Sequence, residues 1–498
     1  MKSNFEKLLK ITNKIADLHY ANSLLSWDQE CYMPSKGSRY RAQQMATLSG
    51  LAHELSTSQE YEDLLKRCNE DKNLNSIEKR NVELLLKDYE KAKKLSTEFV
   101  QRLSIATSRA FQAWIGARRS NDFKAFVPEL ENMLSIQKEK AEIYGYEEHI
   151  YNALINDYEE GAKVSDLDIL FSQVSSKLKP LMDKIASSKQ VEDGFMYQNF
   201  AKDAQWNYGI EILKQLGYDM EAGRQDISEH PFSTSFSPED VRVTTRVNEN
   251  NLYDMLWSCI HEGGHALYEQ GLSAEQYGLP CGSAVSLGIH ESQSRFYENN
   301  IGRSFAFWQL NFDKLKNTFP QQLAKVDLQK FYEAVNIVKP SLIRTDADEL
   351  SYHFHIMIRY ELEKKMLEGS LQVKELKDAW NAAYKEYLNV DVPSDKEGVL
   401  QDVHWSHGGF GYFPTYSLGS FYAAQFEAKM KQDIPSFEED IQANDFTKIL
   451  SWLRGNIHQH GRFYNSEELC KNATGEGLNF DYFLKYSEEK YKKIYQFS

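Results

Sequence analysis

Long runs with helical periodicity dominate the first half of this sequence. Over residues 76–120 (SIEKRNVELLLKDYEKAKKLSTEFVQRLSIATSRAFQAWIGARRS), apolar residues recur every three or four positions, which places them on one face of an α-helix. Only 11 prolines interrupt the 498 residues, and no Gly/Ser linker, low-complexity tract or internal repeat marks a boundary. We therefore expect a mostly α-helical fold in which residues 1–498 form a single domain.

The composition of the chain narrows the class of protein. Hydrophobic residues make up 41% and charged residues 26%, which is typical of a folded globular protein. Lysine and arginine total 58 against 73 for aspartate and glutamate, so the net charge is −15, and no basic block offers a phosphate-binding surface. These features argue against nucleic acid as a partner.

The location of the protein is suggested by its apolar runs and its cysteines. No segment approaches the ~18 apolar residues that a membrane-spanning helix needs, so we expect no membrane association. The five cysteines are scattered, odd in number and form no CxxC pair, which fits a reducing compartment. We therefore expect a cytoplasmic protein.

One region departs from the helical pattern. In residues 230–247 (HPFSTSFSPEDVRVTTRV), Val241, Val243, Thr245 and Val247 alternate with polar neighbours, which predicts a half-buried β-strand. The preceding Ser-Pro-Glu-Asp indicates a turn, so we expect a small hairpin or sheet. A helical stripe of apolar residues then follows, made of Leu252, Met255, Leu256, Cys259 and Ile260.

The helix expected after this strand carries an HExxH motif. Within SCIHEGGHALYEQG, residues 258–271, His261 and His265 project from the same helix face, where both imidazoles can bind one cation. Glu262 is offset around the helix, near enough to act on a water molecule at the metal. Chance gives roughly 0.03 such matches in a chain of this size, so the pattern favours a zinc hydrolase.

Two consecutive glycines lie inside the same motif. Gly263 and Gly264 each weaken an α-helix by about 1 kcal/mol relative to alanine. A helix that nevertheless keeps two of them is expected to be approached closely by another segment, although they can also be simply tolerated.

A catalytic zinc needs a third protein ligand and one open position. The stretch SLGIHESQSRFYEN, residues 286–299, offers Glu291, which a second helix after the GLPCGSA loop would bring beside the histidines. His290 and Glu298 compete for this role. A purely structural alternative is an ion pair between Glu291 and Arg295 on a solvated helix face, because these residues are four apart.

Six motifs along the chain can be considered together. They are SWDQECYMPSKGSRYRAQQ at 26–44, HPF at 230–232, HEGGH at 261–265, HESQS at 290–294, IRTDADE at 343–349 and GVLQDVHW at 398–405. In their order and relative spacing they resemble the carboxypeptidase Taq family of metal-dependent carboxypeptidases, and the resemblance covers essentially the whole chain. HExxH alone is only moderately specific, whereas the complete set is strong.

This resemblance implies a metal site and a fold. It makes His261, His265 and Glu291 the ligands of a zinc ion, with Co2+ as an alternative activating metal, and Glu262 the catalytic acid and base. Some family members carry aspartate where this chain has His230, so that residue receives no role. The implied fold is a large two-lobed helical body with a deep active-site groove and a small β-sheet next to the zinc helix, commonly assembled as a homodimer.

The resemblance also implies a mechanism. Zinc lowers the pKa of a water molecule and polarises the scissile carbonyl. Glu262 takes the water proton during attack and later delivers it to the leaving amine. The expected substrates are peptides with a free C-terminus.

An exopeptidase must recognise the terminal carboxylate, and a guanidinium suits this task because it binds two oxygens in one plane. Arg344 in IRTDADE is the candidate. A structural alternative is an ion pair of Arg344 with Asp346, Asp348 or Glu349. These acids could instead hold the zinc-binding histidines, and Asp348 is the one we consider for that role.

Rings, glycines and hydrogen-bond donors are concentrated in QDVHWSHGGFGYFPTYSLGS, residues 401–420, a composition typical of an ordered loop that lines a pocket. Tyr412 or Tyr416 could donate to the tetrahedral oxyanion. His404 or His407 could orient the substrate. Packing in the core is the alternative for each of these rings.

The favoured function is a zinc carboxypeptidase that releases residues from peptide C-termini. A related helical metallo-endopeptidase or oligopeptidase shares HExxH and a downstream glutamate, but the IRTDADE and GVLQDVHW motifs favour the exopeptidase. The third hypothesis is a non-catalytic helical peptide-binding protein without a working metal site. A further hypothesis is that extended substrate pairs with the strand at 241–247 through main-chain hydrogen bonds.

Overall fold

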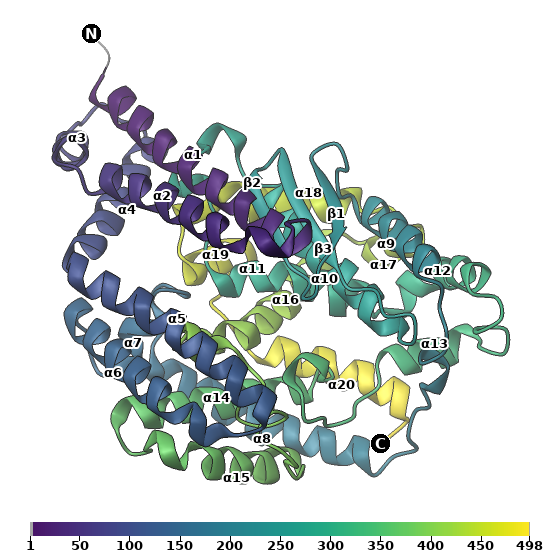
Figure 1. Cartoon of the computed structure of the whole chain (residues 1–498). Helices are drawn as coiled ribbons and strands as arrows, with labels where there is room; N and C mark the ends of the chain where they lie inside the picture. Colours follow the sequence, from purple (N-terminus) through teal and green to yellow (C-terminus); the bar gives the residue numbers. More distant parts are fainter. Residues whose placement is uncertain (1–2, 498) are drawn as a thin grey trace. The chain divides into compact units, whose positions relative to one another are not determined.

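The computed structural model describes residues 3–497 and is mostly α-helical with one three-stranded sheet (Figure 1), as the sequence predicted. The chain divides into two compact units, which agrees with the expected two lobes. Unit 1 comprises residues 1–93, 192–335 and 422–478, and unit 2 comprises residues 94–191, 336–421 and 479–498. Within the described residues, no helix combines the length and apolar character needed to cross a membrane. The expected deep groove and the single domain over residues 1–498 stay predictions.

Most of the helices belong wholly or almost wholly to one unit. Those of unit 1 are α1 (Asn4–Cys31), α2 (Ser38–Ser56), α3 (Gln59–Asn69), α4 (Ser76–Lys94), α9 (Lys202–Leu216), α10 (Leu252–Glu269), α11 (Leu287–Arg295), α12 (Phe305–Thr318), α13 (Leu328–Val335), α17 (Phe437–Gln442), α18 (Thr447–Asn456) and α19 (Ser466–Thr474). Those of unit 2 are α5 (Thr97–Ser120), α6 (Val127–Tyr144), α7 (Ile150–Ile155), α8 (Val164–Ala186), α14 (Ser351–Glu368), α15 (Leu376–Leu388) and α20 (Asp481–Tyr495). Helix α16 (Pro414–Asp433) contributes residues to both units.

The sheet of unit 1 consists of β1 (Gly223–Ile227), β2 (Ser233–Ser237) and β3 (Asp240–Thr245) in the order β1-β3-β2. The hairpin β2–β3 and its turn confirm the expectation from the sequence, although β3 ends two residues before Val247. Strand β1 adds to β3 in parallel, with Gly223 opposite Val241. Because β3 is the central strand, both of its edges are occupied, and the hypothesis that substrate pairs with it is wrong.

Helix α10 begins at a side-chain cap, because Asn251 accepts a hydrogen bond from the backbone N–H of Tyr253. It packs against β3, α9 and α11 (Figure 1). The whole predicted apolar stripe of this helix is buried; its members are Leu252, Met255, Leu256, Cys259 and Ile260.

The two glycines of α10 lie where neighbouring segments approach this helix closely. A Cβ added to Gly264 would lie 2.6 Å from the backbone oxygen of Gln293 in α11. One added to Gly263 would lie 2.7 Å from Cδ2 of Leu213 in α9. The close approach expected from the sequence is therefore confirmed, and it sets the spacing between α10 and α11.

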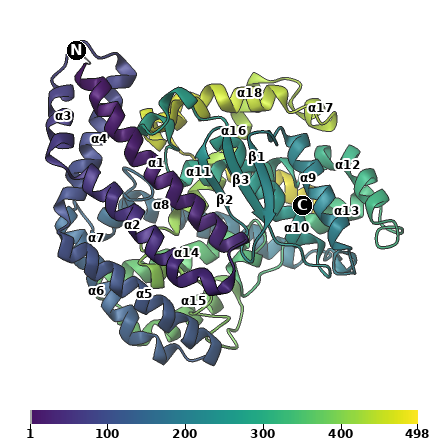
Figure 2. The same ribbon diagram turned by 45° about the horizontal axis from the view of Figure 1, so that its top comes forward.

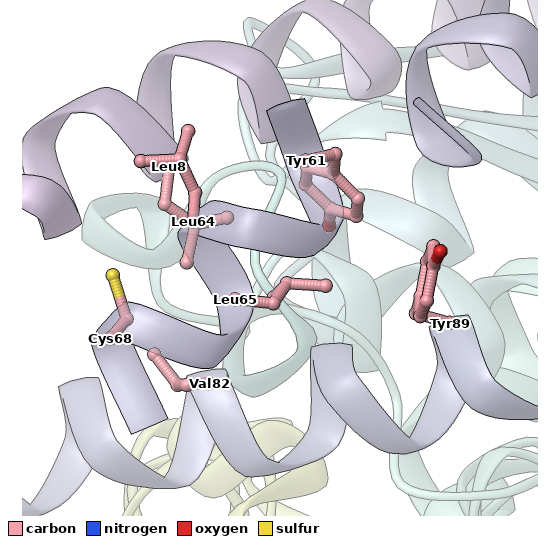
Figure 3. Close-up of a cluster of buried hydrophobic side chains, with 7 residues drawn as sticks. All are labelled: Leu8, Tyr61, Leu64, Leu65, Cys68, Val82 and Tyr89. Atoms are coloured by element: carbon pink, nitrogen blue, oxygen red, sulfur yellow. The ribbon is translucent and has the colours of Figure 1, made fainter. Parts of the chain in front are cut away.

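Helices α1, α3 and α4 of unit 1 are joined by an apolar cluster (Figure 3). Its buried side chains come from all three helices and include aromatic as well as aliphatic groups, so their burial stabilises this part of unit 1. Helix α1 also runs beside β2 (Figure 2). The members of the cluster are Leu8, Tyr61, Leu64, Leu65, Cys68, Val82 and Tyr89.

The core of unit 2 is built around α14, whose residues are buried on nearly every side. Asp348 caps the start of this helix by accepting hydrogen bonds from the backbone N–H groups of Leu350 and Ser351, both at 2.9 Å. Arg359 and Glu363 lie fully buried in the middle of the helix. Buried charges of this kind need partners, and Arg359 has one in Asp402, to which its Nε donates at 2.6 Å.

Candidate functional site

The structure brings His261, His265 and Glu291 together in unit 1. The histidines come from α10 and the glutamate from α11, and one ligand atom of each lies within 4.8 Å of the others. Oε2 of Glu291 lies 3.7 Å from Nε2 of His261 and 3.4 Å from Nε2 of His265. Two imidazole nitrogens and a carboxylate oxygen therefore converge on one point, which is the donor set of a catalytic zinc site.

The outer nitrogens of both imidazoles have their own partners. Nδ1–H of His261 donates to Oε2 of Glu298 at 2.8 Å, and Nδ1–H of His265 donates to the backbone oxygen of His290 at 3.1 Å. Each bond fixes the ring and leaves the lone pair of Nε2 directed toward Glu291. The residues present thus fit a metal ion.

Glu291 serves two partners with its two oxygens. Nε of Arg295 donates to Oε1 at 2.7 Å, while the hydroxyl of Ser294 donates to Oε2, the oxygen that faces the histidines. Burial opposes ionisation of Glu291, but Arg295 and His261 outweigh it and hold its pKa well below the usual range. The ion pair that the sequence offered as an alternative therefore coexists with a converging carboxylate.

The two competing ligand candidates lie outside this group. Glu298 is on the π-helical turn Phe296–Ile301 and receives hydrogen bonds from Arg295 and Arg303, each at 3.2 Å, in addition to that from His261. His290 contacts Glu269 through Nε2 at 2.9 Å. Nδ1 of His290 also lies 2.6 Å from Nδ1 of His265. Glu298 and His290 thus each contact one of the candidate ligands without joining the group themselves.

Glu262 is buried beside His261. Burial raises the pKa of Glu262 to about 7, and a hydrogen bond with Ser233 of β2 partly offsets this. A carboxyl group with a pKa near neutrality can both accept and donate a proton under physiological conditions. The small sheet therefore contributes directly to the surroundings of this residue.

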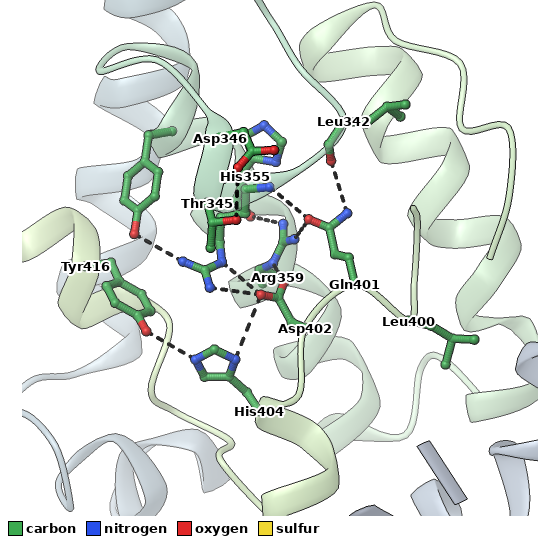
Figure 4. Close-up of polar contacts among 12 residues, drawn as sticks. Leu342, Thr345, Asp346, His355, Arg359, Leu400, Gln401, Asp402, His404 and Tyr416 are labelled. Carbon is green, nitrogen blue, oxygen red and sulfur yellow. Dashed lines mark hydrogen bonds and ion pairs between the residues drawn. The ribbon is translucent and has the colours of Figure 1, made fainter. Parts of the chain in front are cut away.

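Arg344 belongs to unit 2, where it bonds to Asp402, a labelled member of the polar cluster in Figure 4. Its Nε and Nη2 donate to Oδ1 of Asp402 at 3.0 and 2.9 Å, and its Nη1 donates to the hydroxyl of Tyr352 at 3.2 Å. Arg344 therefore does form an ion pair, as in the structural alternative, but with Asp402, a partner that the sequence had not indicated.

The acids of IRTDADE have other tasks. Glu349 pairs with Lys490 at 2.8 Å, and Asp348 caps α14. The sequence suggested Asp348 as a group that holds a histidine ligand, and the structure does not place it there. Glu298 has this role for His261.

Of the four ring candidates from residues 401–420, Tyr416 contacts Arg344, and His404 and Tyr412 contact Tyr416. Its guanidinium carbon lies 4.9 Å from the ring centroid of Tyr416, whose hydroxyl is 3.2 Å from Nε2 of His404. The ring of Tyr412 lies 5.3 Å from that of Tyr416. Burial lowers the pKa of His404 to about 3, so this imidazole is neutral.

His407 is placed differently. It is exposed, and its ring centroid lies 4.8 Å from that of Phe111 in α5. His230, which received no role, is likewise exposed.

Sequence reasoning missed two residues of these clusters, Glu298 as the partner of His261 and Asp402 as the partner of Arg344. The only signal for Asp402 was its place in the GVLQDVHW motif. The sequence indicated Glu298 as a competing metal ligand and not as the partner of His261.

Comparison with known proteins identifies the family. The family model of carboxypeptidase Taq (M32) metallopeptidases matches residues 7–491. Carboxypeptidase 1 of Bacillus subtilis is 38% identical over 99% of this chain and 98% of its own length, and thermostable carboxypeptidase 1 of Thermus thermophilus is 38% identical over 99% of both chains. The crystal structure of an M32 carboxypeptidase from Deinococcus radiodurans superimposes with a TM-score of 0.98 at 39% identity, covering 100% of both chains. The chain therefore belongs to the carboxypeptidase Taq (M32) family and is a metallocarboxypeptidase.

Proposed function

We propose that this enzyme removes amino acids one at a time from peptide C-termini with a zinc ion held by His261, His265 and Glu291. The convergence of their ligand atoms, with both outer nitrogens engaged elsewhere, carries the proposal. Zinc is favoured over cobalt because two imidazoles and one carboxylate are a common catalytic zinc set.

In this proposal each residue near the metal has a defined task. The metal, when bound, supplies a Lewis acid that polarises the scissile carbonyl and lowers the pKa of water. Glu262 accepts the proton of the attacking water and returns it to the leaving amine, a role that its pKa of about 7 supports. Glu298 holds His261 in the orientation that directs Nε2 inward.

The polar cluster of unit 2 is assigned to the substrate. Arg344 binds the terminal carboxylate, and Tyr416 or Tyr412 donates to the oxyanion of the tetrahedral intermediate. His404, neutral and bonded to Tyr416, orients that hydroxyl. His407 is assigned to the part of the substrate farther from the C-terminus. Its ring is exposed and lies against Phe111, so it does not belong to the group of residues around Arg344.

The setting of the enzyme is also proposed. We infer a cytoplasmic location, which the absence of disulfides among the five cysteines supports within the described chain. A homodimer and a single peptidase domain over residues 1–498 are inferred from the resemblance to the family.

The test is a mass-spectrometric time course on an unstructured twelve-residue peptide with the zinc-loaded enzyme. A ladder that shortens from the C-terminus, is blocked by C-terminal amidation and is absent with Glu262→Gln is the expected result. Internal cuts that ignore amidation would instead indicate an endopeptidase. An intact peptide together with an enzyme that retains no metal would indicate a non-catalytic peptide-binding protein.

A further inference from the structure

Asp402 accepts hydrogen bonds from two arginines of unit 2, Arg344 and Arg359; Figure 4 labels Asp402 and Arg359. Its Oδ1 accepts two hydrogen bonds from Arg344, and its Oδ2 accepts one from Nε of Arg359 at 2.6 Å. The side chain of Arg359 is 0% exposed and that of Arg344 is 8% exposed. One carboxylate therefore faces two buried guanidinium groups, of which only Arg344 reaches solvent.

The groups joined directly by the hydrogen bonds of Asp402 are two guanidinium groups and one carboxylate, so these three side chains together carry one positive charge in excess. Burial lowers the pKa of His404 to about 3 and keeps the pKa of His355 well below its usual range, so neither histidine adds charge. Asp402 balances one guanidinium. Glu363, one turn after Arg359 on α14, directs its oxygens to Trp405, Tyr151 and Gly411 and bonds to neither arginine in the described chain.

Arg359 is held too firmly to act as the recognition group itself. Its Nη1 donates to the backbone oxygen of His355 at 2.8 Å, and its Nη2 donates to Oε1 of Gln401 at 2.8 Å. The same Gln401 oxygen accepts the backbone N–H of Arg344 at 2.9 Å. These bonds fix Asp402 and the backbone of Arg344 in one frame.

Arg344 keeps donors for a ligand. Among the described residues, the bonds to Asp402 and Tyr352 account for three of its five N–H groups, which leaves two. A carboxylate with a single negative charge would satisfy these donors and neutralise the excess charge.

We propose that Asp402 is a positioning residue, which orients the guanidinium of Arg344 for the terminal carboxylate of the peptide, and that Arg359 provides the second cation that preserves the excess charge. This inference rests on the proposed function, in which Arg344 receives that carboxylate. If Asp402 paired with Arg344 alone, the pair would be neutral and would attract a carboxylate less strongly. In this arrangement Asp402 fixes the orientation of the Arg344 guanidinium, and Arg359 leaves the three side chains with a net positive charge.

The test measures binding without turnover. In the zinc-loaded Glu262→Gln enzyme, isothermal titration gives the dissociation constants of a tetrapeptide acid and of its C-terminal amide, and their ratio is the preference for the carboxylate. Asp402→Asn is expected to lower this preference at least tenfold, although it adds one positive charge. Asp402→Glu, which keeps the charge and the pairing but displaces the guanidinium by about one methylene, is expected to lower it about fivefold.

The controls separate the two proposals. Glu349→Gln breaks the equally buried pair with Lys490 and is expected to leave the preference unchanged. If the parent enzyme shows no preference for the acid, carboxylate recognition by Arg344 is refuted. If Arg344→Lys abolishes the preference but both Asp402 variants keep it in full, the positioning role is refuted while the proposed function stands. Because Asp402→Glu preserves the buried charges, a folding failure of Asp402→Asn does not leave the question open.

Discussion

Glu298 accepts a hydrogen bond from Nδ1–H of His261 at 2.8 Å, and this single contact determines which ring nitrogen of His261 faces Glu291. Arg295 links the two glutamates, since its Nε bonds to Glu291 and its Nη1 bonds to Glu298. The orientation of the candidate ligands thus depends on groups that do not contact the metal position themselves.

Removing this contact should weaken metal binding. Glu298→Gln retains the shape of the side chain but loses the charge that orients His261, and we expect zinc affinity to fall 10- to 100-fold. Competition with a fluorescent chelator measures the change. Glu427→Gln is a matched control, because Glu427 is another buried carboxylate of unit 1 and bonds to Asn300 and Lys431 instead of to His261. Equal affinities in Glu298→Gln and the parent would contradict the orienting role.

Glu262 should be needed for turnover and not for metal binding. Glu262→Gln cannot accept the proton of the attacking water, and general acid-base catalysis of this kind contributes about 10²- to 10⁴-fold. We therefore expect kcat to fall by about 10³-fold while one zinc per chain is retained. Steady-state kinetics and metal analysis of the same sample test both halves. Loss of the zinc together with the activity would count against a purely catalytic role.

Gly264 should be intolerant of any side chain. The Cβ of Gly264→Ala would meet the backbone of Gln293 and Ser294 at 2.6 and 2.7 Å, so α10 and α11 must move apart. We expect a loss of about 1–3 kcal/mol in the free energy of unfolding and weaker zinc binding. Gly116→Ala is the control, because no neighbouring atom lies within 4 Å of its added Cβ in α5. That change should stabilise the enzyme by about 0.5–1 kcal/mol, as judged by chemical denaturation.

His458 should make the enzyme sensitive to acid. Its Nε2–H donates to Oε1 of Gln293 at 2.9 Å, and burial lowers its pKa to about 3. Since an unfolded histidine titrates near 6.5, the unfolded chain binds more protons between pH 6.5 and 3, and stability falls as the pH decreases through this range. The free energy of unfolding of the parent relative to His458→Gln should decrease by up to about 1.4 kcal/mol per pH unit below 6.5. If the free energies of unfolding of the parent and of His458→Gln change with pH in parallel, His458 is not the source of the acid sensitivity.

Local patterns explain which parts of the site were visible in the sequence. His261 and His265 share a helix face by their spacing alone, and the alternation at Val241 and Val243 is enough to predict a strand. By contrast, Asp402 lies 58 residues after Arg344, so only the tertiary fold can pair them. The parallel partner β1 (GRQDI) shows no alternation of apolar and polar residues, and it was not predicted.

The π-helical turn at Phe296–Ile301 shows another limit. A π-turn shifts the side chains that follow it around the helix axis, so positions read with a 3.6-residue period no longer indicate the correct face. Glu298 lies within this turn, and its contact with His261 depends on how α11 and the turn pack against α10, which the sequence alone does not show.

The complete donor set lies within one continuous segment, residues 261–291, whereas Arg344 and Asp402 belong to the other compact unit. If Arg344 binds the terminal carboxylate as proposed, mutations that change substrate specificity can accumulate in unit 2 without altering a metal ligand. Specificity could then evolve while the residues of the hydrolytic site are inherited unchanged. A directed-evolution library confined to residues 344–420 would explore new specificities from a starting point that still holds its metal.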